Sequence, residues 1–421
     1  MRKGRLHATH LISLCLVFML TSTMKLAWAQ EILPHPFAVD VRSAVLMDAN
    51  SGEFLYGQNP DERINPASFV KLLTLFLIFD AVDQGQVVLE DKVWISEKAW
   101  RTGGSKMFVR QGDRVPLVEL VKGIAVVSGN DACVAVAEFL QGNEQAFVEK
   151  MNQKIRELGL ENTQFQTVNG WPSPDQYTTA RDMAIMAREY IQSHPQALQY
   201  HQMKHFTHEG IRQKNRNGLL WRDPSVDGLK TGHTEKAGYH LLATARRDEQ
   251  RFIAVVMDAD SEAVREREAL RLLNYGFRNF VSVRLFQKGD ALLRLPVWKG
   301  TENEVQLLAA ESGIVTVPID QQADISWEAK APERLFAPIR TGQKIGEAVI
   351  GTKEKVFDTV SLVADHDIPE AGFFKQLLHS TALAFKDHGL LITFVFLLVC
   401  GAAVGVFLFR RMPKRKRVTR K

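Results

Sequence analysis

One stretch constrains this chain more than any other: residues 65–71, Asn-Pro-Ala-Ser-Phe-Val-Lys, which run directly into an apolar segment that ends at Phe79. Pro66 suits a first helical turn because it needs no amide partner, and nothing from Ser68 to Phe79 interrupts helical geometry. Nearly every side chain in that span is apolar, so no face of the helix is left for water. The sequence therefore predicts a buried helix, in which Lys71 is the exception.

Lys71 is predicted to take part in catalysis rather than to be a solvated surface residue. Burying an ammonium group is costly unless the group is paired or loses its proton. Ser68 lies three residues earlier, so its hydroxyl and the amine share one helix face within hydrogen-bonding reach. The helix N-terminus adds amide donors and positive potential beside the serine, where an anionic tetrahedral intermediate can be held. Ser68 and Lys71 together are predicted to be a nucleophile and its base.

Alone, Ser-x-x-Lys is weak evidence, because chance produces it often and a surface serine beside a solvated lysine is the usual explanation. Two further motifs stand downstream. Ser128-Gly129-Asn130 matches Ser-Asp-Asn at its outer positions, and Lys230-Thr231-Gly232 follows it. This is the order found in serine acyl-transferring, penicillin-recognising enzymes. The three motifs together indicate acyl transfer.

The overall charge of +5 misleads, because both ends of the chain are basic and carry no acids. Residues 1–29 hold four Lys or Arg and residues 389–421 hold eight, which leaves 41 bases against 48 acids between them. An acidic body argues against nucleic acid as a partner.

The two ends are predicted to be targeting and membrane segments. Residues 1–29 have early basic residues, an apolar stretch and Ala-Trp-Ala before Gln30, which is typical of a cleaved secretory signal peptide. Residues 389–409 are uncharged over 21 positions, enough for a transmembrane helix. The basic tail, 410–421, is then expected in the cytoplasm. The segment before the helix, 367–388, is amphipathic enough to lie along the membrane.

Cysteine usage excludes an intramolecular disulfide. Cys15 lies in the predicted signal peptide and Cys400 in the predicted transmembrane segment, so the exported body contains only Cys133. Because Cys133 stands in an apolar run, it is predicted to be a small buried hydrophobe rather than a nucleophile.

Between the ends, the chain predicts two folded domains. The first, 30–278, has strand-like segments, then helical ones, then two strands and a helix: Ser43 to Asp48, Glu53 to Gln58, Pro116 to Val127, Ala132 to Leu140, Glu144 to Leu158, Ala180 to Ile191, Tyr239 to Arg246, Arg251 to Met257 and Glu262 to Tyr275. Helices inserted between strands in this way predict an α+β domain, an antiparallel sheet with helices packed on it. Short strand-like runs predict a small all-β domain over 279–366.

The chain resembles the low-molecular-mass penicillin-binding proteins that act as D-alanyl-D-alanine carboxypeptidases of the bacterial periplasm, over roughly residues 35–385. The segments that carry the resemblance are Asn65 to Lys71, Ser128 to Ala132, Thr179 to Ala184, Asn215 to Leu220 and Val226 to Thr234. The resemblance implies a β-lactamase/transpeptidase-like fold, peptidoglycan stem peptides as substrate, acylation by β-lactam antibiotics, and no cofactor or metal. It also implies a periplasmic catalytic domain held at the inner membrane.

The resemblance implies roles in the chemical steps. Ser68 would attack the carbonyl of the penultimate D-Ala, with Lys71 as base and Ser128 relaying protons. The backbone amides of Ser68 and His233 would form the oxyanion hole.

It also implies a binding site for the substrate. Asn130 would hold the substrate amide, and Lys230, which starts the motif ending at Gly232, would place positive charge near the substrate carboxylate. Thr231 and Arg216 would bind that carboxylate directly.

Two loops depart from the family pattern. The loop at 169–171 reads Asn-Gly-Trp, where the family usually has a smaller aliphatic residue after the glycine, and Asp258 to Asp260 replaces a small, glycine-containing segment. These changes affect contacts at the rim of the site.

Three alternatives remain. A β-lactamase or a D,D-endopeptidase would use the same three motifs. The β-lactamase is disfavoured, because no Glu-x-x-Leu-Asn occurs between Asn130 and Lys230 to supply a deacylating acid. A metal-dependent hydrolase is suggested by His201, His205 and His208, although solvated surface histidines explain them better, since no acidic ligand is adjacent. A non-catalytic wall-binding protein would keep the fold. Such a protein does not need the three motifs, so their presence in this chain argues against this alternative.

Overall fold

The computed structural model describes residues 37–411, except for the side chains of 385, 387, 389–392 and 404–411. The predicted signal peptide and most of the basic tail lie outside the described residues. The described chain separates into two compact units. The first comprises the described residues up to Met47 together with Glu53–Ala245 and Ile253–Leu273, and the second comprises Asp48–Gly52, Arg246–Phe252 and the chain from Asn274 onward.

The first unit is built on a five-stranded sheet with the strand order β2-β1-β9-β8-β7. Its strands are β1 (Ser43–Asp48), β2 (Phe54–Gln58), β7 (Val226–Thr234), β8 (Gly238–Arg247) and β9 (Gln250–Ala259). The predicted hairpin is confirmed, because β1 and β2 pair antiparallel. The sequence analysis did not identify β7, which pairs antiparallel with β8 and forms an edge of the sheet.

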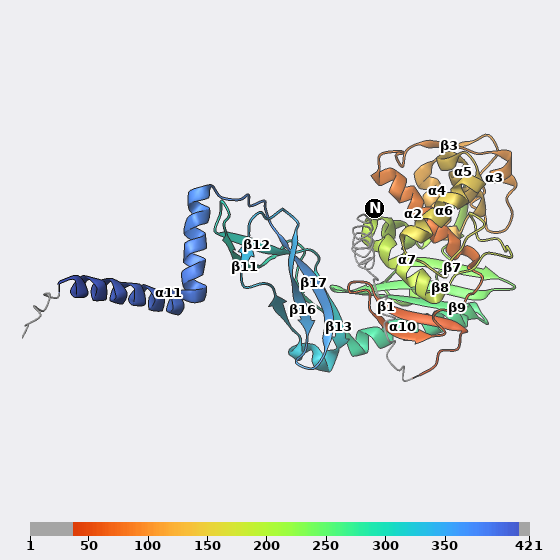
Figure 1. Ribbon diagram of the computed structural model, residues 1–421. Coiled ribbons are helices and arrows are strands. Elements are labelled where there is room, and N and C mark those ends of the chain that lie inside the picture. The colour runs from red at the N-terminus through yellow and green to blue at the C-terminus, as the bar shows by residue number, and fades with distance from the viewer. Residues whose placement is uncertain (1–36, 412–421) are drawn as a thin grey trace, which may run out of the picture. The chain divides into compact units, whose positions relative to one another are not determined.

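Helices α2, α4, α5, α6 and α7 lie on one side of this sheet (Figure 1). The helices of the unit are η1 (Ala67–Phe69), α2 (Val70–Asp83), α3 (Glu97–Arg101), α4 (Leu117–Val127), α5 (Asn130–Gln141), α6 (Glu144–Glu157), α7 (Ala180–Ser193), η2 (Pro195–Ala197), α8 (Leu198–His201), α9 (Leu219–Arg222) and α10 (Glu262–Asn279). Two short hairpins complete it, β3 (Lys92–Trp94) with β4 (Arg114–Pro116) and β5 (His205–His208) with β6 (Ile211–Lys214).

Helix α2 is the centre of the helical layer. Every residue from Val70 to Phe79 is buried, as the apolar run predicts, because α4, α5, α6 and α7 pack against α2. Polar caps define the ends of neighbouring helices: the side chain of Asn143 accepts from the backbone N of Ala146 at the start of α6, and Thr179 does the same for α7. The first unit therefore confirms the predicted α+β domain.

The second unit confirms the predicted all-β domain. Its strands are β10 (Phe280–Phe286), β11 (Ala291–Trp298), β12 (Glu304–Ala309), β13 (Gly313–Pro318), β14 (Ser326–Lys330), β15 (Leu335–Phe336), β16 (Lys344–Gly351) and β17 (Val356–Ala364), with one 3₁₀ helix, η3 (Ile319–Asp324). Alternate residues of several strands point into one apolar core, for example Val305, Leu307 and Ala309 of β12.

The predicted transmembrane helix at 389–409 is wrong. These residues belong to α11 (Phe373–Arg411), which is interrupted by non-helical backbone at His388. Among the described residues, no helix has the length and apolar character needed to cross a membrane. The prediction used the absence of charge over 21 positions. Absence of charge alone does not establish a spanning helix, which also requires about 20 consecutive apolar residues in one continuous helix.

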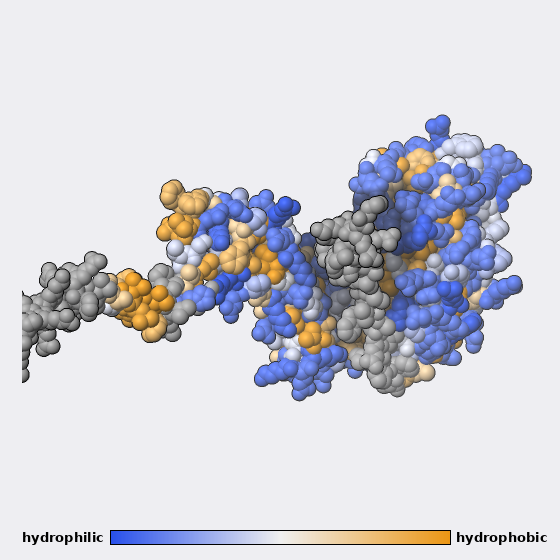
Figure 2. Space-filling model, in the orientation of Figure 1, coloured by the Kyte–Doolittle hydropathy of each residue, from blue (hydrophilic) through white to orange (hydrophobic). Residues whose placement is uncertain are grey.

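Helix α11 nevertheless exposes many apolar side chains, among them Phe373, Phe374, Leu377, Leu378 and 394–399. Figure 2 shows apolar surface, in orange, gathered on this part of the chain. In its first turns the polar residues face inward instead: the ammonium of Lys375 donates to the Thr301 carbonyl at 2.8 Å, and His379 Nδ1 accepts from the Lys299 backbone N at 2.8 Å. Large exposed apolar surface of this kind marks a site that contacts a membrane or another protein.

Candidate active site

The nucleophile predicted from the sequence lies where the chain enters α2. Ser68 is in η1, and Lys71 lies three residues later in the first turn of α2. Lys71 Nζ donates to Ser68 Oγ at 2.9 Å and to the carbonyl oxygen of Asn169. Lys71 is fully buried, and loss of hydration lowers its pKa from 10.5 to about 8. A buried amine with this pKa can accept the serine proton near neutral pH.

The turn before Ser68 is shaped by its neighbours. Asn65 Oδ1 accepts a hydrogen bond from the backbone N of Ala67 at 3.0 Å, and Ala67 has a left-handed φ of 47°. Gly170 packs so closely on this turn that a Cβ at residue 170 would lie 1.8 Å from the Ala67 carbonyl oxygen. Gly170 also has a φ of 84°. Only glycine satisfies both the space and the backbone conformation, which explains the glycine of the 169–171 loop.

Ser128 and Asn130 lie at the junction of α4 and α5. Ser128 follows α4 with left-handed backbone angles, φ 59° and ψ 38°, which end the helix and turn the chain. Asn130 begins α5, and its Nδ2 donates to the Gly103 carbonyl at 2.8 Å. Among the described residues, Asn130 Oδ1 has no hydrogen-bond partner. This oxygen is therefore available to accept an N–H from a ligand.

Asp131 is a structural anchor that the sequence analysis did not identify. Its carboxylate is fully buried and accepts hydrogen bonds from four backbone N atoms at 2.9 to 3.3 Å, those of Met107, Phe108, Val109 and Ala132. Such charge-assisted bonds are stronger than neutral ones. Asp131 thus holds residues 107–109 against the start of α5, beside Asn130.

Lys230 joins the third motif to the second. Its Nζ donates to Ser128 Oγ at 2.9 Å and to the Thr231 carbonyl at 3.0 Å. Burial, followed by the positive charges of Lys71 and Arg216, lowers the pKa of Lys230 well below its ordinary value. The charge of Arg216 also contributes to the lowered pKa of Lys71. Mutual repulsion among these cations favours an anionic ligand in their midst.

The remaining predicted binding residues lie beside the nucleophile or on the surface above it. Thr231 and Gly232 are buried in β7, and a Cβ at Gly232 would lie 3.3 Å from the Pro66 carbonyl oxygen, so the strand passes directly beside the nucleophile turn. His233 is exposed, and its ring stacks on Tyr239 with 4.0 Å between the centroids. Arg216 is exposed, and its guanidinium has no hydrogen-bond partner among the described residues.

An open cleft of about 440 Å³ lies at this place. Ser68, Asn130 and His233 line it, whereas Lys71 and Lys230 are buried. The lining includes the 169–171 loop, which was expected at the rim of the site. It also includes residues that the sequence analysis did not assign to the site: Gly104, Ser105, Pro172, Thr234, Glu235 and Lys236. The loop at 103–105 was recognisable from its Gly and Ser content, but this composition does not indicate which surface a loop faces.

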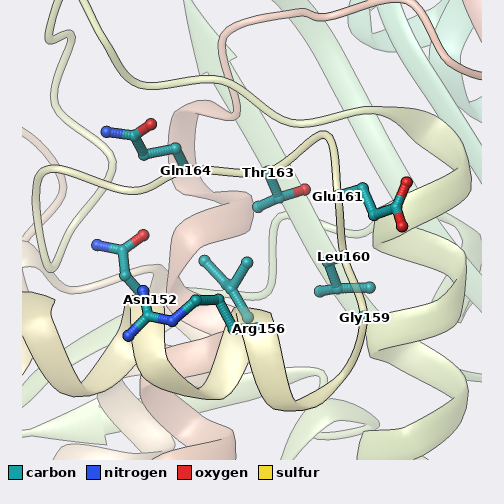
Figure 3. A pocket seen from close by; sticks show the side chains of 8 residues that line it. Asn152, Arg156, Gly159, Leu160, Glu161, Thr163 and Gln164 are labelled. Atoms are coloured by element: carbon teal, nitrogen blue, oxygen red, sulfur yellow. The ribbon is translucent and has the colours of Figure 1, made fainter. Parts of the chain in front are cut away.

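A second cavity, of about 610 Å³, lies elsewhere in the first unit, at the C-terminal end of α6. Figure 3 shows Arg156 and Glu161 on opposite sides of it. Its lining contains none of the predicted site residues, and the hydroxyl of Thr163 there already bonds to Thr178 and Asp182. Volume alone would favour this cavity. The smaller cleft is the candidate active site because Ser68, the predicted nucleophile, lines it, and the amine of Lys71 lies 2.9 Å from Ser68 Oγ.

The histidines at 201–208 need a correction. His201 is buried, not solvated, and its Nδ1 donates to the Leu229 carbonyl at 2.8 Å while its Nε2 lies 3.0 Å from the Tyr190 hydroxyl. Burial lowers the pKa of His201 to about 4. Within residues 37–411, no group of three or more His, Cys, Asp or Glu is arranged to hold a metal ion. Cys133 is buried as predicted, which raises the pKa of its thiol to about 12.

Family models match both units. Residues 30–261 match the Peptidase_S11 family, described as D-alanyl-D-alanine carboxypeptidase, and residues 280–370 match the C-terminal domain of penicillin-binding protein 5. Among curated proteins, D-alanyl-D-alanine carboxypeptidase DacC of Escherichia coli K12 is 37% identical over 370 residues, which cover 86% of this chain and 92% of DacC.

Solved structures agree with these matches. Penicillin binding protein 5 from Haemophilus influenzae is 38% identical, with a TM-score of 0.76 over 80% of this chain and 100% of that one. Penicillin-binding protein D2 from Listeria monocytogenes, solved in the ampicillin-bound form, is 28% identical, with a TM-score of 0.54 over 58% of this chain and 100% of that one.

Proposed function

Because the chain belongs to the Peptidase_S11 family of D-alanyl-D-alanine carboxypeptidases, we propose that it removes the terminal D-Ala from peptidoglycan pentapeptide side chains through an acyl-enzyme on Ser68. The carboxypeptidase activity and the serine-type chemistry follow from the family. The single observation that supports the acyl-enzyme is the buried amine of Lys71, 2.9 Å from Ser68 Oγ. A serine hydroxyl is a weak nucleophile without such a base.

In the first step, neutral Lys71 takes the proton of the Ser68 hydroxyl. Ser68 Oγ forms a bond to the carbonyl carbon of the penultimate D-Ala, and the carbonyl oxygen becomes an oxyanion. The bond to the nitrogen of the terminal D-Ala then breaks, and that nitrogen receives a proton, so the terminal D-Ala leaves as a free amino acid. Water then attacks the ester carbon, and its proton replaces the one given to the leaving nitrogen. As the ester bond breaks, Ser68 Oγ regains its proton from Lys71 and the shortened peptide leaves as an acid.

Ser128 and Lys230 are suited to deliver the proton to the leaving nitrogen. The ammonium of Lys230 donates to Ser128 Oγ at 2.9 Å, so a proton given up by Ser128 is replaced from Lys230. The left-handed backbone of Ser128 holds its hydroxyl at the α4–α5 junction, beside Asn130. Because Lys71 donates to Ser68 and Lys230 donates to Ser128, each of the two hydroxyls has its own amine.

Recognition of the substrate is assigned to the rest of the cleft. We place the terminal carboxylate near Lys230, Thr231 and Arg216, because burial and the charges of Lys71 and Arg216 lower the pKa of Lys230 and an anion would offset this repulsion. Asn130 Oδ1 would accept the substrate N–H, since Nδ2 is already bonded to Gly103. The backbone amides of Ser68 and His233, both in the cleft lining, are proposed as the oxyanion hole.

The same site is proposed to react with β-lactams, whose strained amide places a carbonyl carbon before Ser68. The ampicillin-bound form of the Listeria relative supports this. The missing Glu-x-x-Leu-Asn motif between Asn130 and Lys230 distinguishes the chain from a class A β-lactamase, so the acyl-enzyme formed with penicillin is expected to persist.

The reaction is proposed to take place outside the cytoplasm, where peptidoglycan lies, with the catalytic unit in the periplasm of a bacterium. The signal-like pattern of residues 1–29 and the exposed apolar side chains of α11 support export and contact with the outer surface of the inner membrane.

Replacement of Ser68 tests the proposal. Ser68→Ala should abolish covalent labelling by a fluorescent penicillin and D-Ala release, while costing only about 1 kcal/mol of stability. Ser105→Ala is the matched control, because Ser105 lines the same cleft without an amine at its hydroxyl. Labelling retained in Ser68→Ala, or lost equally in both variants, would refute the assignment.

A further inference from the structure

His240 is a buried residue that takes part in none of the proposed chemical steps. It lies in β8 directly opposite Gly232 of β7, and it is fully buried. Its ring lies 5.3 Å from the ring of Phe69, centroid to centroid. A Cβ at Gly232 would meet His240 Cδ2 at 3.2 Å on one side and the Pro66 carbonyl oxygen at 3.3 Å on the other. The ring of His240 therefore packs against β7 and against the turn that carries Ser68.

Both nitrogens of the His240 ring are bonded, and their partners determine its tautomer. The backbone N of Asp258 donates to Nδ1 at 2.9 Å, so Nδ1 carries no proton. Nε2 lies 2.9 Å from the carbonyl oxygen of Asn65, which can only accept, so Nε2 carries the proton and donates it. His240 is thus a neutral bridge between β9 and the chain that leads to Ser68.

The position of the Asn65 carbonyl affects the turn that carries Ser68. The same residue accepts from the Ala67 backbone N through its side chain, and Ala67 holds a left-handed φ of 47° one residue before Ser68. The chain from 65 to 68 is therefore held at its start by His240 and at its bend by Asn65 itself. Displacement of the Asn65 carbonyl would move Ser68 relative to the residues of β7.

We infer that His240 is a positioning residue for the nucleophile: its Nε2–H holds the Asn65 carbonyl and so sets where Ser68 stands against β7. The inference rests on the proposed role of Ser68. Reacting atoms must be held close to their productive geometry, and a displacement of about 1 Å can reduce the rate about 100-fold. The site has two features that suit such a role, full burial and a hydrogen bond at each ring nitrogen.

The ring environment maintains the neutral state that this bridge needs. Burial lowers the pKa of His240 to about 4, against the opposing effect of its hydrogen bonds. Two charged groups act on the ring: the carboxylate of Asp258 raises its pKa and the guanidinium of Arg265 lowers it. A proton on Nδ1 would face the Asp258 N–H and break the bridge.

Two substitutions remove the two hydrogen bonds of His240, to Asn65 and to Asp258, one at a time. In His240→Gln the side-chain amide can place a donor where Nε2 stands, which keeps the bond to Asn65 and loses the acceptor for Asp258. In His240→Asn the shorter side chain can place an acceptor where Nδ1 stands, which keeps the bond to Asp258 and loses the donor to Asn65. Each variant loses one buried hydrogen bond, so a purely structural role predicts similar losses of stability and of rate.

The positioning role predicts an asymmetry. The rate constant for acylation by penicillin and kcat for D-Ala release should fall about 100-fold in His240→Asn and only a few-fold in His240→Gln, with KM nearly unchanged in both. Acylation measured in a single turnover is independent of the folded fraction. Equal rates in the two variants, or a slower His240→Gln, would overturn the inference.

A measurement on the unmodified enzyme keeps the inference testable if a variant fails to fold. Nitrogen NMR of histidine-labelled full-length protein at pH 7 should show a neutral His240 ring with the proton on Nε2 and slow exchange of that proton. A Nδ1–H tautomer or a charged ring would refute the bridge. Inactive wild-type enzyme would refute the proposed function instead, whereas active wild type with two equally active variants would refute only the role of His240.

Discussion

The pH dependence of acylation should report the pKa of Lys71. Burial, assisted by the charge of Arg216, lowers this pKa from 10.5 to about 8. At pH 7 the neutral fraction of a lysine is then about one in ten, against about one in 3000 for an ordinary lysine, so burial provides about 300 times more free base. Without this shift the amine 2.9 Å from Ser68 Oγ would be almost entirely protonated.

Stopped-flow acylation by a fluorescent penicillin from pH 5.5 to 9.5 measures the effect. The acylation rate should rise about tenfold per pH unit below pH 7, bend near pH 8 and level off above it. A rate that still rises about tenfold per pH unit at pH 9.5 would mean that Lys71 is hydrated in the working enzyme. A rate independent of pH between 6 and 9 would mean that the base is not Lys71.

The same pKa affects stability, and the sign can be worked out. The folded pKa of Lys71 is lower than the unfolded one, so between about pH 8 and 10.5 the unfolded chain binds the proton more tightly. The free energy of unfolding should therefore rise as the pH increases across that window, by about 3 kcal/mol from this group. Urea unfolding of the wild type, compared with Lys71→Met, measures this contribution, which should vanish in the variant.

Three substitutions test other contacts. Lys71→Arg keeps the charge but cannot lose a proton, so the acylation rate in stopped flow should fall about 1000-fold; a near-normal rate would place the base elsewhere. Gly170→Ala places a Cβ 1.8 Å from the Ala67 carbonyl oxygen, and the rate should fall about 100-fold, whereas Gly159→Ala, also at positive φ but with open space around it, should keep its rate. Asp131→Asn replaces a carboxylate that accepts four backbone bonds, so urea unfolding should show a loss of about 3 kcal/mol; unchanged stability would show that water substitutes for it.

Local spacing was sufficient to predict the contact between Ser68 and Lys71 and much of the fold. Ser68 and Lys71 are three residues apart on one helix, so their contact follows from helical geometry alone. The apolar run after them predicted the burial of α2, because a helix with no polar face must be covered on all sides. Alternation and turn residues likewise predicted the β1–β2 hairpin and the all-β second unit.

Local patterns were insufficient where burial depends on distant chain. His201 was interpreted as a solvated surface residue, yet the Leu229 carbonyl and the Tyr190 hydroxyl enclose it. The uncharged run at 389–409 was interpreted as a transmembrane helix, which α11 does not confirm. In both cases the surroundings of the side chains were inferred from the composition of a short segment alone.

The sequence by itself determined which residue types were available and, through helical spacing, that Ser68 and Lys71 would meet. Only the tertiary structure decided that Lys230 meets Ser128 across 102 residues of chain, and that the Asn169 carbonyl accepts from Lys71. The physical reason is that a hydrogen bond and a pKa depend on the three-dimensional surroundings of a group. Those surroundings come from elements far apart in sequence, whose approach is set by the packing of the whole unit.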